Sequence, residues 1–195
     1  MTGALSALGW QAVVTGDPDV VRRAERVIVP GQGHFGACVA GLNERGLGEV
    51  LREAVRREVP YFGICLGLQV LFEGSEEDAA PGLGILPGRV VRFAEDLRDA
   101  ASGARLKVPH MGWNALEGVR RDGPAGAVPE GEYVYFVHSY YAVCGEDADV
   151  AARATHGASF GAAVGRGRVW ATQFHPEKSG RAGLAILDAF ARLPA

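Results

Sequence analysis

The chain of 195 residues contains only three cysteines, Cys38, Cys65 and Cys144, and no CxxC pair. An odd number of widely spaced cysteines predicts neither a disulfide framework nor a zinc site, so we expect a cytoplasmic protein. The histidines also lack metal-ligand spacing, and we expect no metal. No apolar run approaches the roughly 18 residues of a membrane span, and the first residues lack the features of a signal peptide. The net charge of −3 leaves no basic excess, so we expect neither a nucleic-acid nor a membrane partner.

The composition is that of a globular protein, with 48% hydrophobic and 22% charged residues, and the length fits a single domain over residues 1–195. In the first half we expect strands at 11–15, 26–29 and 59–64, and helices at 1–10, from 17 onward, at 36–57 and at 66–72. In the second half we expect strands at 89–93, 133–137, 140–143, 150–155, 160–164 and 168–174, then a helix at 180–193. The pattern predicts an α/β protein with a mixed sheet flanked by helices.

The expected junction between strand and helix at residues 63–67 has the sequence Gly-Ile-Cys-Leu-Gly. This is the pattern of a nucleophile elbow with cysteine in the nucleophile position. Small flanking residues are required because the turn is strained and strand and helix approach closely there. The pattern predicts Cys65 as a nucleophile at a helix amino terminus, with the N–H of Leu66 directed at an oxyanion. For this residue alone, a buried and inert cysteine is the alternative.

A histidine and a carboxylate lie two residues apart near the carboxyl end, in Gln-Phe-His-Pro-Glu at 173–177. Pro176 lacks an N–H and keeps His175 out of helical geometry, so we expect an extended segment. In an extended chain, residues i and i+2 share a face. His175 is therefore predicted as the base of the cysteine, and Glu177 as the carboxylate that fixes its tautomer. A structural histidine beside a solvated glutamate is the alternative.

Together these residues resemble the class I (triad) glutamine amidotransferases, which carry a Gly-x-Cys-x-Gly elbow and a late His-Pro-Glu. The resemblance extends over nearly the whole chain. Residues 30–36 (PGQGHFG) are similar to the oxyanion loop of the family. Residues 109–114 (PHMGWN), 135–140 (YFVHSY) and 175–179 (HPEKS) are similar to its histidine-biosynthesis branch. The resemblance implies a flavodoxin-like, mostly parallel sheet with added antiparallel strands.

The resemblance also implies the roles of individual residues. Gln69 follows the nucleophile by four residues, on the same helical face, and would contact the amide or carboxylate of L-glutamine. The implied oxyanion and substrate residues are Gln32, Gly33, Leu66, Gln69, His138, Ser139 and Tyr140. A solvent-facing Gln69 and tyrosines packed in the core are the alternatives.

By the same resemblance the chain is a glutaminase that needs no cofactor. It would hydrolyse glutamine to glutamate and pass the ammonia to a (β/α)8-barrel cyclase subunit in a heterodimer. The products there would be imidazole glycerol phosphate and an aminoimidazole carboxamide ribonucleotide. The positions that match cyclase-facing residues of the family are Trp113, Asn114, Tyr135 and Lys178. Core packing is the alternative for Trp113 and Tyr135.

The amino terminus departs from the pattern of the family. Relatives usually begin with an additional strand and an Asn-containing loop, whereas this chain opens with the expected first helix. We therefore expect the first strand of the sheet to be missing and the true start to lie upstream, which mass spectrometry of the native amino terminus would test.

Three other functions remain open at this point. The chain could serve another class I amidotransferase, of guanylate, anthranilate, carbamoyl phosphate or pyridoxal phosphate synthesis, although residues 109–114 and 175–179 argue against these. It could be a Cys-His peptidase or γ-glutamyl hydrolase that acts alone. It could also be a catalytically inactive binding module, although the complete set of Cys65, His175 and Glu177 argues against that.

Overall fold

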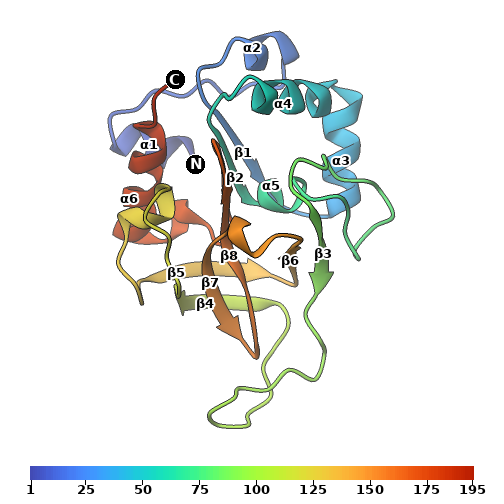
Figure 1. The fold of residues 1–195 in the computed structure, drawn as a ribbon, viewed down its shortest axis with the longest axis vertical. Helices are drawn as coiled ribbons and strands as arrows, with labels where there is room; N and C mark the ends of the chain where they lie inside the picture. The colour runs from blue at the N-terminus through green and yellow to red at the C-terminus, as the bar shows by residue number, and fades with distance from the viewer.

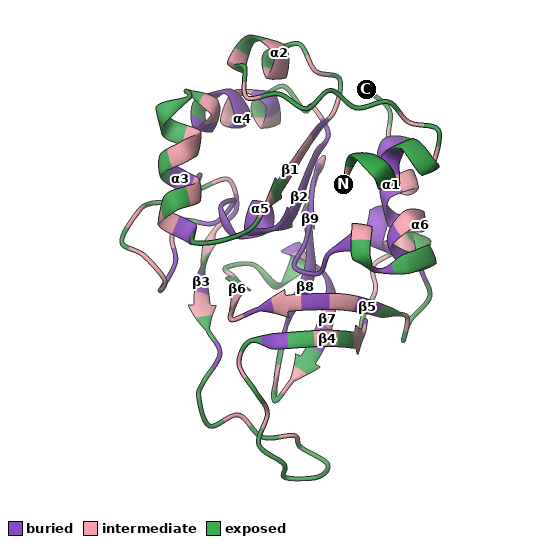
Figure 2. Ribbon diagram, turned by 180° about the vertical axis from the view of Figure 1, so that it is seen from behind, coloured by how far each residue is buried: buried purple, intermediate pink, exposed green.

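The computed structural model describes all residues, 1–195, and places five strands in the main sheet, in the order β1-β2-β9-β8-β7 (Figures 1 and 2). These strands are β1 (Val27–Gly31), β2 (Tyr61–Cys65), β7 (Val150–His156), β8 (Ala158–Arg166) and β9 (Val169–Thr172). The pairs β1–β2 and β2–β9 are parallel, whereas β9–β8 and β8–β7 are antiparallel. The expected α/β fold with a mixed sheet is confirmed.

Two antiparallel pairs of strands stand outside the main sheet. The first joins β3 (Gly88–Arg92) to β6 (Tyr140–Cys144), and the second joins β4 (His110–Ala115) to β5 (Tyr133–His138). The sequence pattern did not indicate β4, because Gly112 and Asn114 interrupt it and both residue types are depleted in strands. The strand forms because each of its residues pairs with one of β5.

Helices cover both sides of the sheet. They are α1 (Thr2–Ala7), α2 (Pro18–Arg22), α3 (Phe35–Glu44), α4 (Leu47–Arg56), α5 (Leu66–Gln69) and α6 (Gly180–Ala191). In Figure 1, α1 and α6 lie on one side of β1 and β2, and α3 and α4 lie on the other. The expected start of α2 is present, since the side chain of Asp17 accepts a hydrogen bond from the N–H of Asp19. The helical pattern at 36–57 forms two helices, because Gly46 adopts a left-handed conformation between them.

The central strand β2 is buried along its whole length, as Figure 2 shows in purple. Its successive side chains enter two different cores. Phe62 and Ile64 pack with Phe190 on the α6 side, whereas Tyr61 packs with Phe35 on the α3 side. This alternation follows from the two-residue period of a strand covered on both faces. It fixes the carboxyl end of β2, where Cys65 stands, between two packed layers.

Two expected elements differ from the structure. Residues 11–15 form no strand, and Val13 and Val14 are about four-fifths exposed. An extended segment needs a ladder partner, and β1 at the sheet edge pairs only with β2. The helix expected at 66–72 ends as α-helix at Gln69. Beyond it, the carbonyls of Val70, Leu71 and Phe72 accept hydrogen bonds from residues 83–86 instead of continuing the helix.

No helix of the chain is both long enough and apolar enough to cross a lipid bilayer.

Candidate active site

Cys65 occupies a strained junction between β2 and α5. Its φ of 54° and ψ of −106° lie in a region that residues with a side chain rarely adopt. A Cβ added at Gly63 would lie 2.4 Å from the carbonyl oxygen of Gly67, and one added at Gly67 would lie 1.8 Å from that of Val29. Both glycines are therefore required by close backbone approach, as expected for a nucleophile elbow. Because α5 is a single turn, any dipole effect on the sulfur is smaller than a long helix would give.

His175 and Glu177 stand where the chain leaves β9. The Nδ1–H of His175 donates to Oε1 of Glu177 at 2.9 Å, which leaves Nε2 as the nitrogen that can take a proton. The backbone of His175 is held on both sides, since its N–H donates to the carbonyl of Tyr135 and its carbonyl accepts from the hydroxyl of Ser179. The pair expected from the sequence is thus formed.

Cys65 and Glu177 shift the proton affinity of His175, and His175 in turn shifts that of Glu177. Burial lowers the pKa of His175, but its hydrogen bonds with Cys65 and Glu177 outweigh burial and raise the pKa to about 9. Burial raises the pKa of Glu177, but the hydrogen bond from His175 outweighs it and the net shift is downward. Low proton affinity at the carboxylate and high affinity at the imidazole favour a charged His175–Glu177 pair. The thiol and the ring lie far apart in sequence and meet here.

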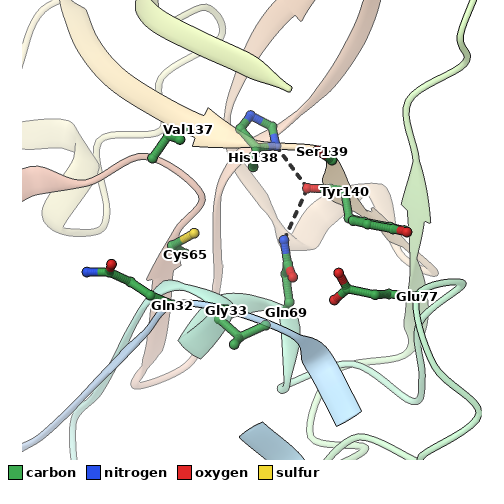
Figure 3. Close-up of a pocket in the computed structure, with 10 residues that line it drawn as sticks. Gln32, Gly33, Cys65, Gln69, Glu77, Val137, His138, Ser139 and Tyr140 are labelled. Atoms are coloured by element: carbon green, nitrogen blue, oxygen red, sulfur yellow. Dashed lines mark hydrogen bonds between the residues drawn. The ribbon is translucent and has the colours of Figure 1, made fainter. Parts of the chain in front are cut away.

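A cavity of about 270 Å³ opens beside the sulfur of Cys65 (Figure 3). Its lining contains every oxyanion and substrate residue expected from the sequence, and its members are Gln32, Gly33, Cys65, Leu66, Gln69, Glu77, Val137, His138, Ser139 and Tyr140. His175 is buried and does not line this cavity. The cavity lies slightly below the range of about 300–1,000 Å³ of drug-sized pockets, which suits a small polar ligand.

Comparisons with known proteins agree with this geometry. A family model described as glutamine amidotransferase class-I matches residues 16–192. The chain belongs to this family. A curated relative from Aromatoleum aromaticum, named imidazole glycerol phosphate synthase subunit HisH, is 49% identical over 184 residues, which cover 94% of this chain and 86% of the relative. A relative of the same name from Methylococcus capsulatus is 50% identical over 92% of this chain and 82% of its own length.

Solved structures show the same fold. A crystal structure described as a glutamine amidotransferase superposes with a TM-score of 0.71, at 23% identity, over 97% of this chain and 92% of that one. A Trypanosoma brucei structure, described as a CTPS glutaminase domain with bound acivicin, superposes with a TM-score of 0.61 at 17% identity, over 98% of this chain and 85% of that one. At these identities the likeness is evidence of fold alone.

Gln69 of this class I amidotransferase is buried at the cavity wall, so the solvent-facing alternative is wrong. Its Nε2 donates to the carbonyl of Tyr140 and to Oε1 of Gln173, both at 3.1 Å. Because an amide nitrogen carries two hydrogens, both donors are used within the chain. Only Oε1 of Gln69 is left for a ligand, and it can accept hydrogen bonds but cannot donate them.

Glu77 is a wall residue that the sequence did not indicate. Its Oε2 accepts a hydrogen bond from the N–H of Phe35 at 2.7 Å, and its side chain faces the cavity across from Cys65 (Figure 3). The only signal was its place in the acidic and glycine-rich segment 73–87, whose composition predicts a surface loop. Glu77 thus gives the cavity a carboxylate and ties it to the first turn of α3.

His138 reaches the cavity as a neutral ring. Its Nδ1–H donates to the carbonyl of Tyr140 at 2.8 Å, so its Nε2 accepts from Nδ1 of His110 at 3.1 Å. Burial lowers the pKa of His138 to about 3 and that of His110 to about 4, where His156 adds to the effect. No group of three or more His, Cys, Asp or Glu side chains in the chain is arranged to hold a metal ion.

Three of the four expected partner-facing residues lie together on one surface. Trp113 is 55% exposed, so packing in the core is wrong for it. Its ring and that of Tyr135 are arranged edge to face, with their centroids 6.0 Å apart. The ammonium of Lys178 lies 5.8 Å from the ring of Tyr135. Asn114 differs from these three, because its amide donates to the carbonyl of Thr155 within the chain.

Proposed function

We propose that this class I amidotransferase is the glutaminase subunit of an imidazole glycerol phosphate synthase, and that Cys65, His175 and Glu177 are its catalytic triad. The observation that carries the proposal is geometric. A cysteine on a strained elbow forms the wall of a small polar cavity, and an imidazole that a carboxylate orients stands close enough for the sulfur to raise its pKa. The choice among amidotransferases rests on relatives of that name at 49% and 50% identity.

The reaction begins with the thiol proton of Cys65 already transferred to Nε2 of His175, a charge separation that the raised pKa of the ring favours, and the carboxylate of Glu177 stabilises the imidazolium. The sulfur attacks the side-chain amide carbon of glutamine, and backbone N–H groups of Leu66 and the Gln32–Gly33 loop stabilise the oxyanion. His175 then protonates the departing nitrogen, and ammonia leaves a thioester on Cys65. Water, deprotonated by the same imidazole, hydrolyses the thioester to glutamate and restores the thiol.

The cavity offers complementary groups for the rest of the substrate. We assign the carboxylate of Glu77 to the α-ammonium of glutamine, because it is the acidic side chain of the wall and stands opposite Cys65. Oxygen Oε1 of Gln69 can accept a hydrogen bond from the same ammonium or from the substrate amide. Ser139 and Tyr140 complete the wall near the amino-acid end.

The ammonia would pass to a (β/α)8-barrel cyclase that docks on the surface of Trp113, Tyr135 and Lys178. Large apolar side chains of β4 and β5 are exposed there, Met111 and Tyr133 among them, and aromatic residues are favoured anchors of interfaces. A heterodimer, a single domain, a cytoplasmic location and the lack of a cofactor belong to the same proposal.

The test uses the complex of this chain with a cyclase subunit. Cys65→Ala should abolish synthesis with glutamine but leave synthesis with added ammonium salts at the wild-type level, because only ammonia production needs the thiol. Cys144→Ala is the matched control, since that cysteine lies at the far end of β6 and should keep both activities. Glutamine-dependent synthesis by the Cys65→Ala complex would refute the assignment of the nucleophile.

A further inference from the structure

A second side chain contacts the sulfur of Cys65. Gln173 lies between β9 and His175 and is completely buried, and its Nε2 donates to Sγ of Cys65 at 3.6 Å. Its Oε1 accepts from Gln69. Burial of an amide is unfavourable unless its groups are hydrogen-bonded, and one of the partners here is the nucleophile itself.

The direction of this amide is fixed by the chain of hydrogen bonds behind it. The carbonyl of Tyr140 can only accept, so Gln69 must turn its NH₂ group toward it. The second hydrogen of that NH₂ group then points to Gln173, which must present its oxygen to Gln69 and its own NH₂ group to Cys65. His138 also donates to the carbonyl of Tyr140 and holds it in place. A Gln173 amide rotated by 180° would lose both its bond from Gln69 and its bond to Cys65.

We propose that Gln173 is a further catalytic residue of the glutaminase site, whose N–H group orients the sulfur of Cys65 and stabilises it as a thiolate. The inference rests on the proposed function only in taking Cys65 as the nucleophile. When Nε2 of His175 removes the thiol proton, the electron pair stays on sulfur, and an N–H donor strengthens as its acceptor becomes charged. The titratable side chain that interacts with the sulfur is His175, whose pKa Cys65 raises, and Glu177 is hydrogen-bonded to its far nitrogen.

Gln173 does not line the cavity, so it has no contact with bound substrate. Loss of its donor should therefore lower kcat and leave KM unchanged. A purely structural role predicts the opposite pattern, in which stability falls and the reactivity of the folded enzyme stays the same. The two roles can thus be separated by experiment.

The test compares two variants with the wild-type chain. Gln173→Met keeps the length of the side chain and removes the donor, whereas Gln173→Glu keeps the shape and directs an anionic oxygen at the sulfur. Iodoacetamide should alkylate Cys65 about tenfold more slowly at neutral pH in Gln173→Met, the effect of one lost hydrogen bond to a charged group. The decrease should be larger in Gln173→Glu, and the pH profile of alkylation should move to higher pH in both. Peptide mass mapping separates Cys65 from Cys38 and Cys144.

Thr172→Val is the matched control. Thr172 is buried next to Gln173, and its hydroxyl donates to the carbonyl of Phe174 at 3.0 Å and not to the sulfur of Cys65. This variant should lower the melting temperature but keep the wild-type alkylation rate. Wild-type alkylation rates and kcat in a folded Gln173→Glu variant would overturn the inference, and this isosteric variant decides the question if Gln173→Met does not fold. Failure of the wild-type Cys65 to react with acivicin would instead count against the proposed function.

Discussion

Glu177 holds the imidazole of His175 through one carboxylate oxygen. Oε1 accepts the Nδ1–H, while Oε2 is buried and has no hydrogen-bond partner within the chain. An unpaired buried oxygen is unfavourable, and groups of this kind concentrate at functional sites. The sulfur of Cys65, as acceptor of the imidazolium N–H, raises the proton affinity of His175, and the hydrogen bond to Glu177 and its negative charge raise it further.

We expect Glu177→Gln to lower kcat for glutamate release by about 10²-fold or more, since the neutral amide neither stabilises the imidazolium nor enforces its tautomer. KM should stay unchanged, because Glu177 does not line the cavity. Steady-state assays of the complex with a cyclase would measure both constants, with ammonium-dependent synthesis as the internal check. Glu146→Gln, at an exposed glutamate remote from the site, should behave as wild type. A kcat of Glu177→Gln close to that of the wild type would contradict the role of Glu177 as the carboxylate that orients His175.

Among single residues, the sequence predicted those site residues well whose motif lies within a few neighbouring positions. The elbow glycines indicate Cys65, the proline at 176 indicates an extended His175, and the oxyanion and substrate residues inferred from the family all reach the cavity. Glu77 and Gln173 escaped prediction because their roles depend on partners distant in sequence. Gln173 meets Cys65 across 108 positions, and no spacing rule reports such a contact.

Among the elements, the junction of β2 and α5 sets the geometry of the nucleophile. Its glycines serve different needs, because Gly63 faces the backbone of α5 itself whereas Gly67 faces the carbonyl of Val29 on β1. Helix α5 is thereby pressed onto the first two strands of the sheet. The position of Cys65 thus depends on a backbone contact that no side chain larger than hydrogen permits.

Gly67→Ala should destabilise the protein by about 3 kcal/mol or more, because its methyl group would overlap the oxygen of Val29 and force α5 away from β1. Gly41→Ala is the control, in the middle of α3 and with no atom within 4 Å of its added methyl group. There we expect stabilisation by about 0.5–1 kcal/mol from the better helix propensity of alanine. Urea unfolding with equal m-values would measure both changes. Equal stability of the two variants would contradict the packing argument.

Helices and strands were predicted best where the hydrophobic pattern of the segment agrees with the packing or pairing partner that the fold provides. The buried strand at 59–64 and the helix at 180–193 have clear periodicity and were found within a few residues of β2 and α6. The strand expected at 11–15 has the right composition but no neighbouring strand to pair with. The strand β4 has a poor composition but a complete partner in β5. Sheet pairing is a tertiary property, so local sequence cannot decide such cases.

On the scale of the whole molecule, buried histidines make stability depend on pH from both directions. The folded state keeps His110 and His138 neutral down to about pH 4 and 3, whereas His175 keeps its proton up to about pH 9. In the unfolded chain all three titrate near their ordinary value of about 6.5. The difference in bound protons between the two states sets the slope of stability with pH.

The melting temperature should therefore be highest near the ordinary histidine value and fall on either side. Above about pH 6.5 the unfolded state loses the proton that folded His175 retains, so the stabilisation declines as pH rises toward about 9. Below about pH 6.5 the unfolded state binds protons that His110 and His138 do not bind in the folded state, so stability declines as pH falls toward about 4. Thermal melts monitored by circular dichroism between these limits would trace both slopes.

Glu177→Gln should flatten the alkaline slope alone, because it removes a cause of the raised pKa of His175, and His110→Gln should reduce the acid slope alone. A melting temperature that rises from pH 6.5 to 9 in the wild type would contradict a charged His175–Glu177 pair.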